Sequence, residues 1–412
     1  MNLYNLEELL VQQNPQWISR EIGAVGFERD IFASFRQELK VKKLILTLSG
    51  PRRNGKTFLL KQSMRWLAQN KHIPHKNICY FQFSGSLNEK NIIPAVLDLF
   101  LKKYAVIGRK YIFLDEIQYV DYWQDQIKSY YDLLGGVKFI ISGSTSLFYR
   151  QKSKESLAGR IIKCKLGVLN FHEYLRFKNI EEPSYDRAKF ISNLSIYKTE
   201  FKTYLALGQY PEIVANPKID AKKYIMDLSD QIINFDIPYF SAKIDRQLFL
   251  SVVKTLSFDL AQEYSANNLA KTLETDRRKI AEYVKILEEI GLFSVCYNNG
   301  FNSMRKKLSG SKKIYGLNLN LPLHLNGFDV SYLNDTRVFG RYFENYVFMR
   351  LLEKYQKIEY YRIEGKELDF VSKDLAFEIK SGLNMDINKY RELSSKLKKK
   401  FSLISEEEAY LI

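Results

Sequence analysis

One short segment restricts the fold of this chain more than any other part of the sequence. Residues 44–60 read LILTLSGPRRNGKTFLL, and residues 50–57 within them fit the pattern G-x-x-x-x-G-K-[ST] without a mismatch. We expect a buried strand over residues 44–48, then a sharp turn, and a helix that begins near residue 58. In such a unit, backbone N–H groups and the positive end of the helix dipole converge on one point. The segment therefore predicts a binding site for phosphate groups.

The residues of this loop have distinct expected roles. Gly50 and Gly55 let the backbone turn sharply enough to point successive N–H groups into one concavity. The ammonium group of Lys56 can reach β- and γ-phosphate oxygens, and the hydroxyl of Thr57 can ligate Mg²⁺. We expect the nucleotide to contact Gly50, Pro51, Arg52, Arg53, Asn54, Gly55, Lys56, Thr57 and Phe58. The alternative, an ordinary glycine loop between a strand and a helix, does not require the complete motif.

A pair of carboxylates ends a second apolar run. Residues 111–116 read YIFLDE, so Asp115 and Glu116 close a strand that is otherwise apolar. We expect Asp115 to hold Mg²⁺ opposite Thr57, and Glu116 to orient and deprotonate the water that attacks the γ-phosphate. The alternative is a helix cap that faces solvent. After a further apolar run, the hydroxyl of Ser144 either senses the γ-phosphate or belongs to a plain turn.

Two other residues are weaker candidates for the nucleotide site. Arg160 can stabilise phosphate charge, either in its own chain or from a neighbouring subunit, but a surface arginine at a helix end fits equally well. Pro211 follows Gly208 in the segment LGQYPE and can pack against an adenine ring. A corner between two helices explains the same glycine and proline. Both residues therefore keep two interpretations.

The sequence predicts an α/β chain of four domains. Apolar strands alternate with helices over residues 1–176, which predicts a parallel sheet covered on both faces, with ligands at the carboxyl ends of its strands. Residues 177–250 are mainly helical and polar, and we expect them to form a lid. Residues 251–320 have the element order of a winged helix-turn-helix. Residues 321–412 combine a helix with three strands.

The winged-helix segment carries basic residues suited to DNA. Its second helix opens with Arg277, Arg278 and Lys279, and more basic residues follow at 305–307, in the expected tip of a hairpin. The whole chain has 63 Lys plus Arg against 47 Asp plus Glu and a net charge of +16, which favours a polyanionic partner such as nucleic acid. Two alternatives stay open: a lysine-rich compositional bias, and a winged helix that serves as a protein-binding module or spacer.

The last domain holds a second set of charged residues. Glu367 and Asp369 share one face of a strand, as do Glu378 and Lys380 of the next, because alternate residues of a strand point to the same side. If the strands pair, Asp369 and Glu378 can share a Mg²⁺ or Mn²⁺ ion, with Glu344 of the preceding helix near it. Lys380 can then help to activate water for phosphodiester hydrolysis. The alternative is an edge hairpin whose charges face solvent.

Cysteine usage and hydropathy indicate the compartment. Cys79, Cys164 and Cys296 lie far apart and match neither a metal-binding spacing nor a disulfide framework. The N-terminus lacks a signal-type apolar core, and no apolar run approaches the ~18 residues of a membrane span. We expect a soluble cytoplasmic protein that has no membrane partner.

These motifs together resemble a known family. They are similar to those of prokaryotic AAA-type P-loop ATPases that carry a winged-helix region and a C-terminal DUF4143 domain, which in turn is similar to the PD-(D/E)XK nuclease, or restriction-endonuclease-like, fold. The ATPase motifs are residues 50–57, 113–118, 141–144, 157–160, 169–175 and 208–214. The nuclease-like motifs are GRYFENYV at 340–347, KELDFV at 366–371 and AFEIKS at 376–381.

The resemblance implies an enzyme that binds ATP and ADP, uses Mg²⁺ and hydrolyses ATP. It assigns the nucleotide, metal and nuclease roles given above to the same residues, and it implies that a homo-oligomer can form. The sequence departs from the family in two places. Phe58 stands where a hydroxyl residue is usual, and Gln209 stands where a second glycine is usual, which weakens the assignment of Pro211.

Three functions are compatible with these parts. The first is an ATPase that couples the state of its nucleotide to DNA engagement, with or without nuclease activity in the last domain. The second is a nucleotide-dependent switch whose last domain binds a partner and does not cleave. The third is a transcriptional regulator.

Overall fold

The chain folds into two compact units, Met1–Gly167 and Val168–Ile412. The computed structural model describes residues 3–412 except for 24–25, 42, 86–90, 146–156, 158, 238–243, 301–309, 364 and 381–386. The basic residues expected at a hairpin tip, 305–307, lie outside the described residues. Each unit has hydrophobic clusters of its own.

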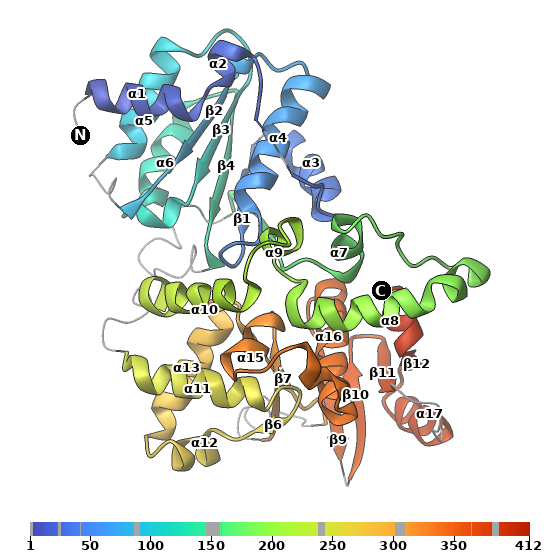
Figure 1. Ribbon diagram of the computed structural model, residues 1–412. Helices are drawn as coiled ribbons and strands as arrows, with labels where there is room; N and C mark the ends of the chain where they lie inside the picture. The colour runs from blue at the N-terminus through green and yellow to red at the C-terminus, as the bar shows by residue number, and fades with distance from the viewer. Residues whose placement is uncertain are drawn as a thin grey trace. The chain divides into compact units, whose positions relative to one another are not determined.

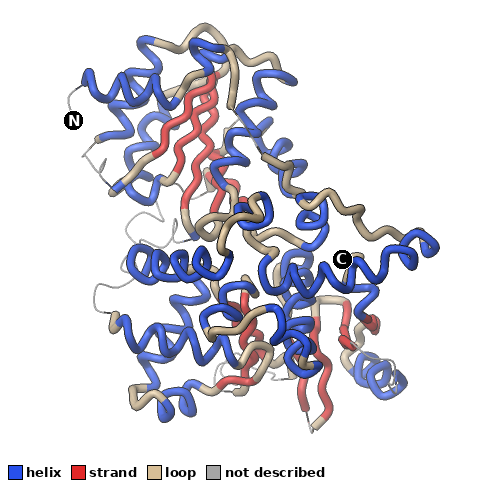
Figure 2. Tube along the Cα trace, viewed as in Figure 1, coloured by secondary structure: helices blue, strands red, loops and turns tan. Residues whose placement is uncertain are grey.

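A five-stranded sheet forms the centre of the first unit (Figures 1 and 2). Its strands follow the order β2-β3-β4-β1-β5, and all neighbouring strands are parallel. The strands are β1 Ile45–Ser49, β2 Ile78–Gln82, β3 Lys110–Asp115, β4 Val137–Gly143 and β5 Ile161–Lys165. Strands β1 to β4 are almost wholly buried because helices cover both faces of the sheet. The parallel α/β sheet predicted from the apolar runs is confirmed.

The helices of the first unit pack on the sheet in two clusters. One cluster joins the sheet to α1, α5 and α6, and the other joins it to α3 and α4. The helices are α1 Leu3–Gln13, α2 Gln16–Ser19, α3 Ile31–Lys40, α4 Lys56–Asn70, α5 Ile92–Lys103 and α6 Trp123–Leu133. Asn14, after α1, accepts a hydrogen bond from the backbone N–H of Tyr80 and donates one to its carbonyl oxygen, both at 2.7 Å. This side chain therefore pairs with the edge strand β2 and protects it.

The second unit contains two smaller sheets. One is antiparallel and has the order β6-β8-β7. The other has the order β12-β11-β10-β9; its strands β11 and β12 are parallel, and the other neighbouring strands described in it are antiparallel. Their strands are β6 Glu263–Tyr264, β7 Phe293–Tyr297, β8 Lys312–Gly316, β9 Glu359–Ile363, β10 Lys366–Val371, β11 Leu375–Lys380 and β12 Lys400–Ser405.

Helices surround these sheets and share one large core with them. That core contains side chains from Val168 to Tyr410. The helices are α7 Phe171–Phe177, α8 Arg187–Leu207, α9 Pro211–Ala215, α10 Ala221–Gln231, α11 Arg246–Phe258, α12 Ala266–Thr272, α13 Arg277–Glu289, α15 Asn320–Leu325, α16 Thr336–Tyr355, α17 Ile387–Lys396 and α18 Glu406–Ala409. The sequence analysis missed α17 and β12. The predicted lid, winged-helix and nuclease-like domains of this region remain predictions. The predicted domain boundary after residue 176 remains a prediction as well.

Candidate functional site

The loop between β1 and α4 lies at the carboxyl end of β1, and its two glycines are required for different reasons. Gly55 has a φ of +90°, and Arg53 a φ of 66°, so both residues adopt the left-handed conformation. A Cβ atom on Gly50 would instead lie 2.3 Å from the carbonyl oxygen of Leu166. Gly50 is therefore required by the close approach of the chain that follows β5, and Gly55 by its backbone angles.

The side chain of Lys56, the first residue of α4, folds back over this loop. Its Nζ donates hydrogen bonds to the carbonyl oxygens of Gly50 and Pro51, both at 3.0 Å, and the residue is only 5% exposed. Arg29, which the sequence analysis missed, holds the same loop through a hydrogen bond from Nη1 to the carbonyl oxygen of Asn54 at 2.9 Å. The loop is therefore preformed around a buried ammonium group.

Asp115 is the centre of a buried network at the end of β3. Its Oδ2 accepts hydrogen bonds from Thr57 Oγ1 and Tyr80 Oη, each at 2.7 Å. Its Oδ1 accepts hydrogen bonds from the Ser142 hydroxyl and from the backbone N–H of Glu116. Burial, helped by the charge of Asp115, raises the pKa of Tyr80, so that the phenol remains a donor. The network brings together the P-loop threonine and the carboxylate expected opposite it, and adds Tyr80, which the sequence did not indicate.

Glu116 follows in a strained backbone conformation, with a φ of 56°. Such a conformation costs about 1–3 kcal/mol in a residue other than glycine and is common at functional sites. The side-chain amide of Gln118 donates a hydrogen bond to the Glu116 carboxylate, and Gln118 Oε1 accepts one from the backbone N–H of Ser144 at 3.3 Å. Gln118 thus links the expected catalytic carboxylate to the expected γ-phosphate sensor. The sequence analysis included this glutamine in the motif at residues 113–118 but gave it no role.

The other residues of the loop differ in how they are held. Both polar side-chain atoms of Asn54 are buried and have no hydrogen-bond partner among the residues that the structure describes. An unpaired buried amide is costly, so Asn54 is a candidate ligand contact. Arg52 Nη2 donates a hydrogen bond to Tyr119 Oη at 3.4 Å. Phe58 is 53% exposed and lies next to Gly26.

Arg160 lies at the amino ends of the strands, opposite the end that carries the phosphate loop. The next residue, Ile161, pairs with Ile45 at the start of β1. Arg160 is therefore roughly 16 Å from the carboxyl end of β1, at about 3.3 Å per residue. Its Nη2 lies 3.3 Å from a carboxylate oxygen of Asp132. The expectation that Arg160 acts on the nucleotide of its own chain is wrong, and a contribution to a neighbouring subunit remains a prediction. Pro211 opens α9 in the second unit, and its role also remains a prediction.

We expect Gly50→Ala to lower the free energy of unfolding by about 1–3 kcal/mol, the usual cost of an added methyl group in a closely packed place. The new Cβ would meet a backbone oxygen, which cannot rotate away as a flexible side chain can. Urea unfolding of both proteins measures the difference. Gly23→Ala is the matched control, because no described atom beyond its chain neighbours lies within 4 Å of a Cβ at Gly23. Equal stability of the two variants would contradict the prediction.

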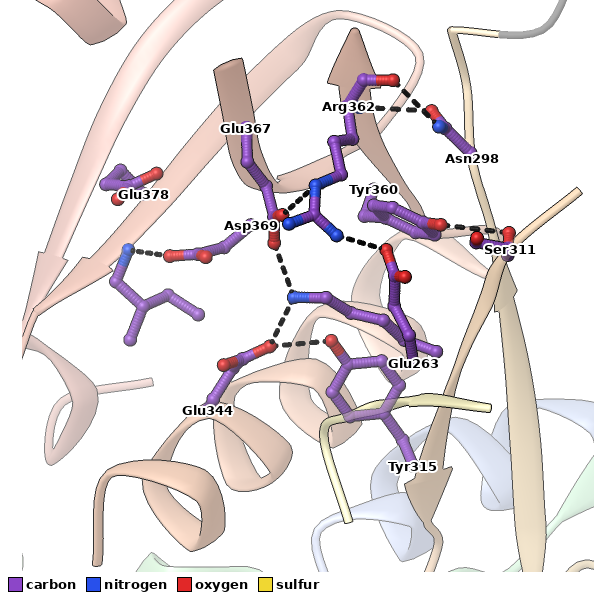
Figure 3. A network of polar contacts seen from close by, with 12 residues as sticks. Glu263, Asn298, Ser311, Tyr315, Glu344, Tyr360, Arg362, Glu367, Asp369 and Glu378 are labelled. Atoms are coloured by element: carbon purple, nitrogen blue, oxygen red, sulfur yellow. Dashed lines mark hydrogen bonds and ion pairs between the residues drawn. The ribbon is translucent and has the colours of Figure 1, made fainter. Parts of the chain in front are cut away.

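In the second unit, a buried lysine, Lys313 of β8, lies among charged residues. Figure 3 shows two of them, Glu344 and Glu367, together with Tyr315. Its Nζ lies 3.2 Å from Glu344 Oε1 on α16 and 2.7 Å from Glu367 Oε1 on β10. The Tyr315 hydroxyl donates a hydrogen bond to the same Glu344 oxygen at 2.7 Å. Burial lowers the pKa of Lys313, but the neighbouring carboxylates outweigh burial and raise it above its ordinary value. The lysine is therefore charged at neutral pH. The sequence analysis did not single out this lysine.

The other expected nuclease residues lie on β10 and β11, which pair antiparallel. Asp369 Oδ2 accepts a hydrogen bond from the backbone N–H of Ile379 at 2.8 Å. Glu378 Oε1 lies 3.0 Å from Lys380 Nζ, whereas Glu378 Oε2 is buried and finds no hydrogen-bond partner within the described ranges. Burial, followed by the charges of the neighbouring glutamates, raises the pKa of Asp369 well above its ordinary value.

These residues do not form the divalent-cation site that the sequence led us to expect. Within the described ranges, no group of three or more His, Cys, Asp or Glu side chains is arranged to hold a metal ion. Glu344 is paired with Lys313, and Glu378 with Lys380. A cavity of about 510 Å³ lies beside them, and its lining includes Asp369 together with cationic side chains.

The fold and the site of the first unit define a P-loop nucleotide-binding domain. Residues 42–175 match the family model AAA_14, described as an AAA domain. Residues 198–331 match DUF8612, a domain of unknown function, in place of the DUF4143 domain that the sequence resemblance implied. The first match, together with the phosphate loop, supports an AAA-type P-loop ATPase. The oxygen atoms of Thr57 and Asp115 are the kind of ligand that Mg²⁺ takes, so these two residues would hold it.

Related chains extend over most of this one. An uncharacterized protein of Haemophilus influenzae is 26% identical over 361 residues, covering 83% of this chain and 84% of that protein. An uncharacterized protein of Methanocaldococcus jannaschii is 27% identical over 370 residues, covering 85% of this chain and 77% of that protein. Among solved structures, the ORC2 protein of Aeropyrum pernix has 10% sequence identity and a TM-score of 0.39, covering 81% of this chain and 94% of that chain. Likeness at that score does not define a shared fold.

No helix in the described part of the chain is both long enough and apolar enough to cross a bilayer.

Proposed function

We propose that the first unit binds ATP with Mg²⁺ and hydrolyses it, and that the state of the nucleotide controls how the second unit engages DNA. The observation that carries the first half is the network around Asp115. It places the hydroxyl of Thr57 against a buried carboxylate, with Glu116 as the next residue. Metal-binding oxygens next to a carboxylate that can accept a proton are what γ-phosphate hydrolysis requires.

The roles of the residues follow from these positions. Lys56 would leave the carbonyl oxygens of its own loop and pair with the β- and γ-phosphates. Thr57 and Asp115 would hold Mg²⁺, and Glu116 would accept the proton of the attacking water. Gln118 would keep the Glu116 carboxylate in place while its other end rests on the backbone of Ser144. Binding of the γ-phosphate at Ser144 would then change the position of the Glu116 carboxylate, because Gln118 contacts both residues.

DNA engagement is supported by the arrangement around α13. Asp276 caps this helix by accepting a hydrogen bond from the backbone N–H of Arg278 at 2.6 Å. Arg277, Arg278 and Lys279 are all exposed in the first turn. Strand β6 precedes the helices α12 and α13, and β7 and β8 follow them, an order that supports a winged helix-turn-helix whose α13 meets the duplex. An exposed cationic first turn suits contacts with phosphate groups.

The second candidate function is a nucleotide-dependent switch, or a transcriptional regulator, whose last domain does not cut nucleic acid. The ion pairs that occupy the C-terminal carboxylates favour it over a nuclease. In either case, the assembly of several subunits is compatible with the proposal, since Arg160 would act on a nucleotide only in another subunit.

The test of DNA engagement is the rate of ATP hydrolysis with and without duplex DNA. We expect stimulation by DNA in the unmodified protein. Arg278→Ala should weaken duplex binding, and the slope of log K against log salt concentration should become shallower by about 0.9, the value for one lost phosphate contact. Lys285→Ala, on the same helix with a side chain 70% exposed, is the matched control and should keep the slope. A protein that hydrolyses ATP but does not bind duplex at low salt would contradict this half of the proposal alone.

A further inference from the structure

Lys313 connects elements that are far apart in the sequence. It lies on β8, while its partners Glu344 and Glu367 lie on α16 and β10. Its side chain is only 8% exposed, and its Nζ also lies 5.6 Å from the centre of the Tyr360 ring. A buried ammonium group is tolerated only where carboxylates and hydrogen bonds compensate for its lost hydration. The carboxylates and the lysine therefore depend on one another.

The same carboxylates belong to the region where the sequence led us to expect a divalent cation. A cation such as Mg²⁺ or Mn²⁺ needs several oxygen ligands free to turn toward it. Here Glu344 and Glu367 each give an oxygen to Lys313, and the second oxygen of Glu367 lies 3.2 Å from Arg362 Nε. Asp369 accepts the hydrogen bond from Ile379 described above.

Three oxygens of the cluster are not accounted for by these contacts: Glu344 Oε2, Asp369 Oδ1 and Glu378 Oε2. Glu378 Oε2 is buried and has no hydrogen-bond partner among the described residues, although the other oxygen of this carboxylate pairs with Lys380. The ammonium groups of Lys313 and Lys380 already balance the charges of Glu344, Glu367 and Glu378, and both would repel a further positive charge placed beside them. The residues therefore do not fit a divalent cation while Lys313 is in place.

We propose that Lys313 takes the place of a divalent cation in the C-terminal carboxylate cluster. Its single fixed charge holds Glu344 and Glu367 together and joins the β6-β8-β7 sheet to the helix and strand that carry them. This protein therefore leaves nucleic acid uncut, because an ammonium group neither lowers the pKa of a bound water nor polarises a phosphodiester oxygen as a metal ion does. The inference concerns the second unit and does not depend on ATP hydrolysis by the first.

The experiment compares thermal unfolding with and without Mn²⁺, without nucleotide, in the full chain. A ligand that binds only the folded protein raises Tm. We expect Mn²⁺ to leave the Tm of the unmodified protein unchanged. Lys313→Met should have a lower Tm than the unmodified protein, and Mn²⁺ should restore part of the loss. The restoration should disappear in the double variant Lys313→Met, Asp369→Asn. Lys312→Met is the matched control, because Lys312 is the neighbouring residue on β8 and should behave as the unmodified protein.

Two results would overturn the proposal. The first is that Mn²⁺ raises the Tm of the unmodified protein, that Asp369→Asn abolishes this rise, and that Thr57→Ala does not. The carboxylate cluster would then already bind a metal without any substitution of Lys313. The second is a folded Lys313→Met protein, judged by circular dichroism, that Mn²⁺ does not stabilise. Plasmid DNA incubated with the unmodified protein and Mn²⁺ gives an independent readout: intact plasmid supports the proposal, and cleavage that Glu378→Gln abolishes overturns it. If Lys313→Met does not fold, the experiments on the unmodified protein still decide.

Discussion

Lys56→Ala is expected to reduce ATP hydrolysis below detection and to weaken ATP binding by about 10- to 100-fold. The ammonium group of Lys56 is buried and already lies 3.0 Å from two carbonyl oxygens of the phosphate loop. A charge-assisted hydrogen bond at such a site contributes about 1.5–3 kcal/mol, which corresponds to this loss of affinity. The effect on hydrolysis is larger, because the same charge stabilises the additional negative charge of the transition state. Phosphate release and titration with a fluorescent ATP analogue measure the two effects separately.

The control for this variant must remove a lysine without touching the loop. Lys61 lies on the same helix, α4, outside residues 50–57, and its side chain is partly exposed. Lys61→Ala therefore tests for a general effect of a lost positive charge on that helix. We expect it to keep both binding and hydrolysis. If Lys56→Ala and Lys61→Ala hydrolyse ATP at the same rate, the assignment of residues 50–57 as the nucleotide site is wrong, and the functional conclusions drawn for the first unit fail with it.

Glu116→Gln should slow hydrolysis by about 100-fold or more and leave ATP binding within about twofold of the unmodified protein. The substitution keeps the shape of the side chain and removes its ability to accept a proton. The backbone of Glu116 is held in the left-handed conformation, and Gln118 donates a hydrogen bond to its carboxylate. The carboxylate is therefore positioned before the nucleotide binds. The variant should lose hydrolysis and keep its folded structure and its affinity for ATP. Single-turnover hydrolysis with enzyme in excess isolates this step from product release.

A carboxylate outside the site is the control for Glu116→Gln. Asp125 is exposed in the first turn of α6, so Asp125→Asn removes a negative charge from the same unit. It should hydrolyse ATP at the unmodified rate. A Glu116→Gln protein that binds ATP and turns it over at the unmodified rate would show that another group accepts the proton. A Glu116→Gln protein that no longer binds ATP would show that the carboxylate has a structural role.

Much of the first unit could be predicted from local sequence. A strand that is buried on both faces must be apolar over most of its length, so runs such as residues 111–114 and 139–141 identify the strands of a parallel sheet directly. The phosphate loop is also local, because its function rests on backbone N–H groups and on residues at fixed spacing. The expected meeting of Thr57 with Asp115 follows from these two facts, since ligands gather at the carboxyl ends of parallel strands.

Local patterns were enough to predict the apolar strands, the glycine positions of the loop and the types of residue at the carboxyl ends of the strands. They could not predict which side chains meet, because these contacts depend on the fold: Gln118 with Glu116 and the backbone of Ser144, Lys313 with Glu344 and Glu367, and Arg160 at the end of the sheet away from the loop. Secondary-structure propensity and hydrophobic periodicity depend on neighbours along the chain. The partner of a buried charge depends instead on strand order and register, which join residues that local patterns cannot relate.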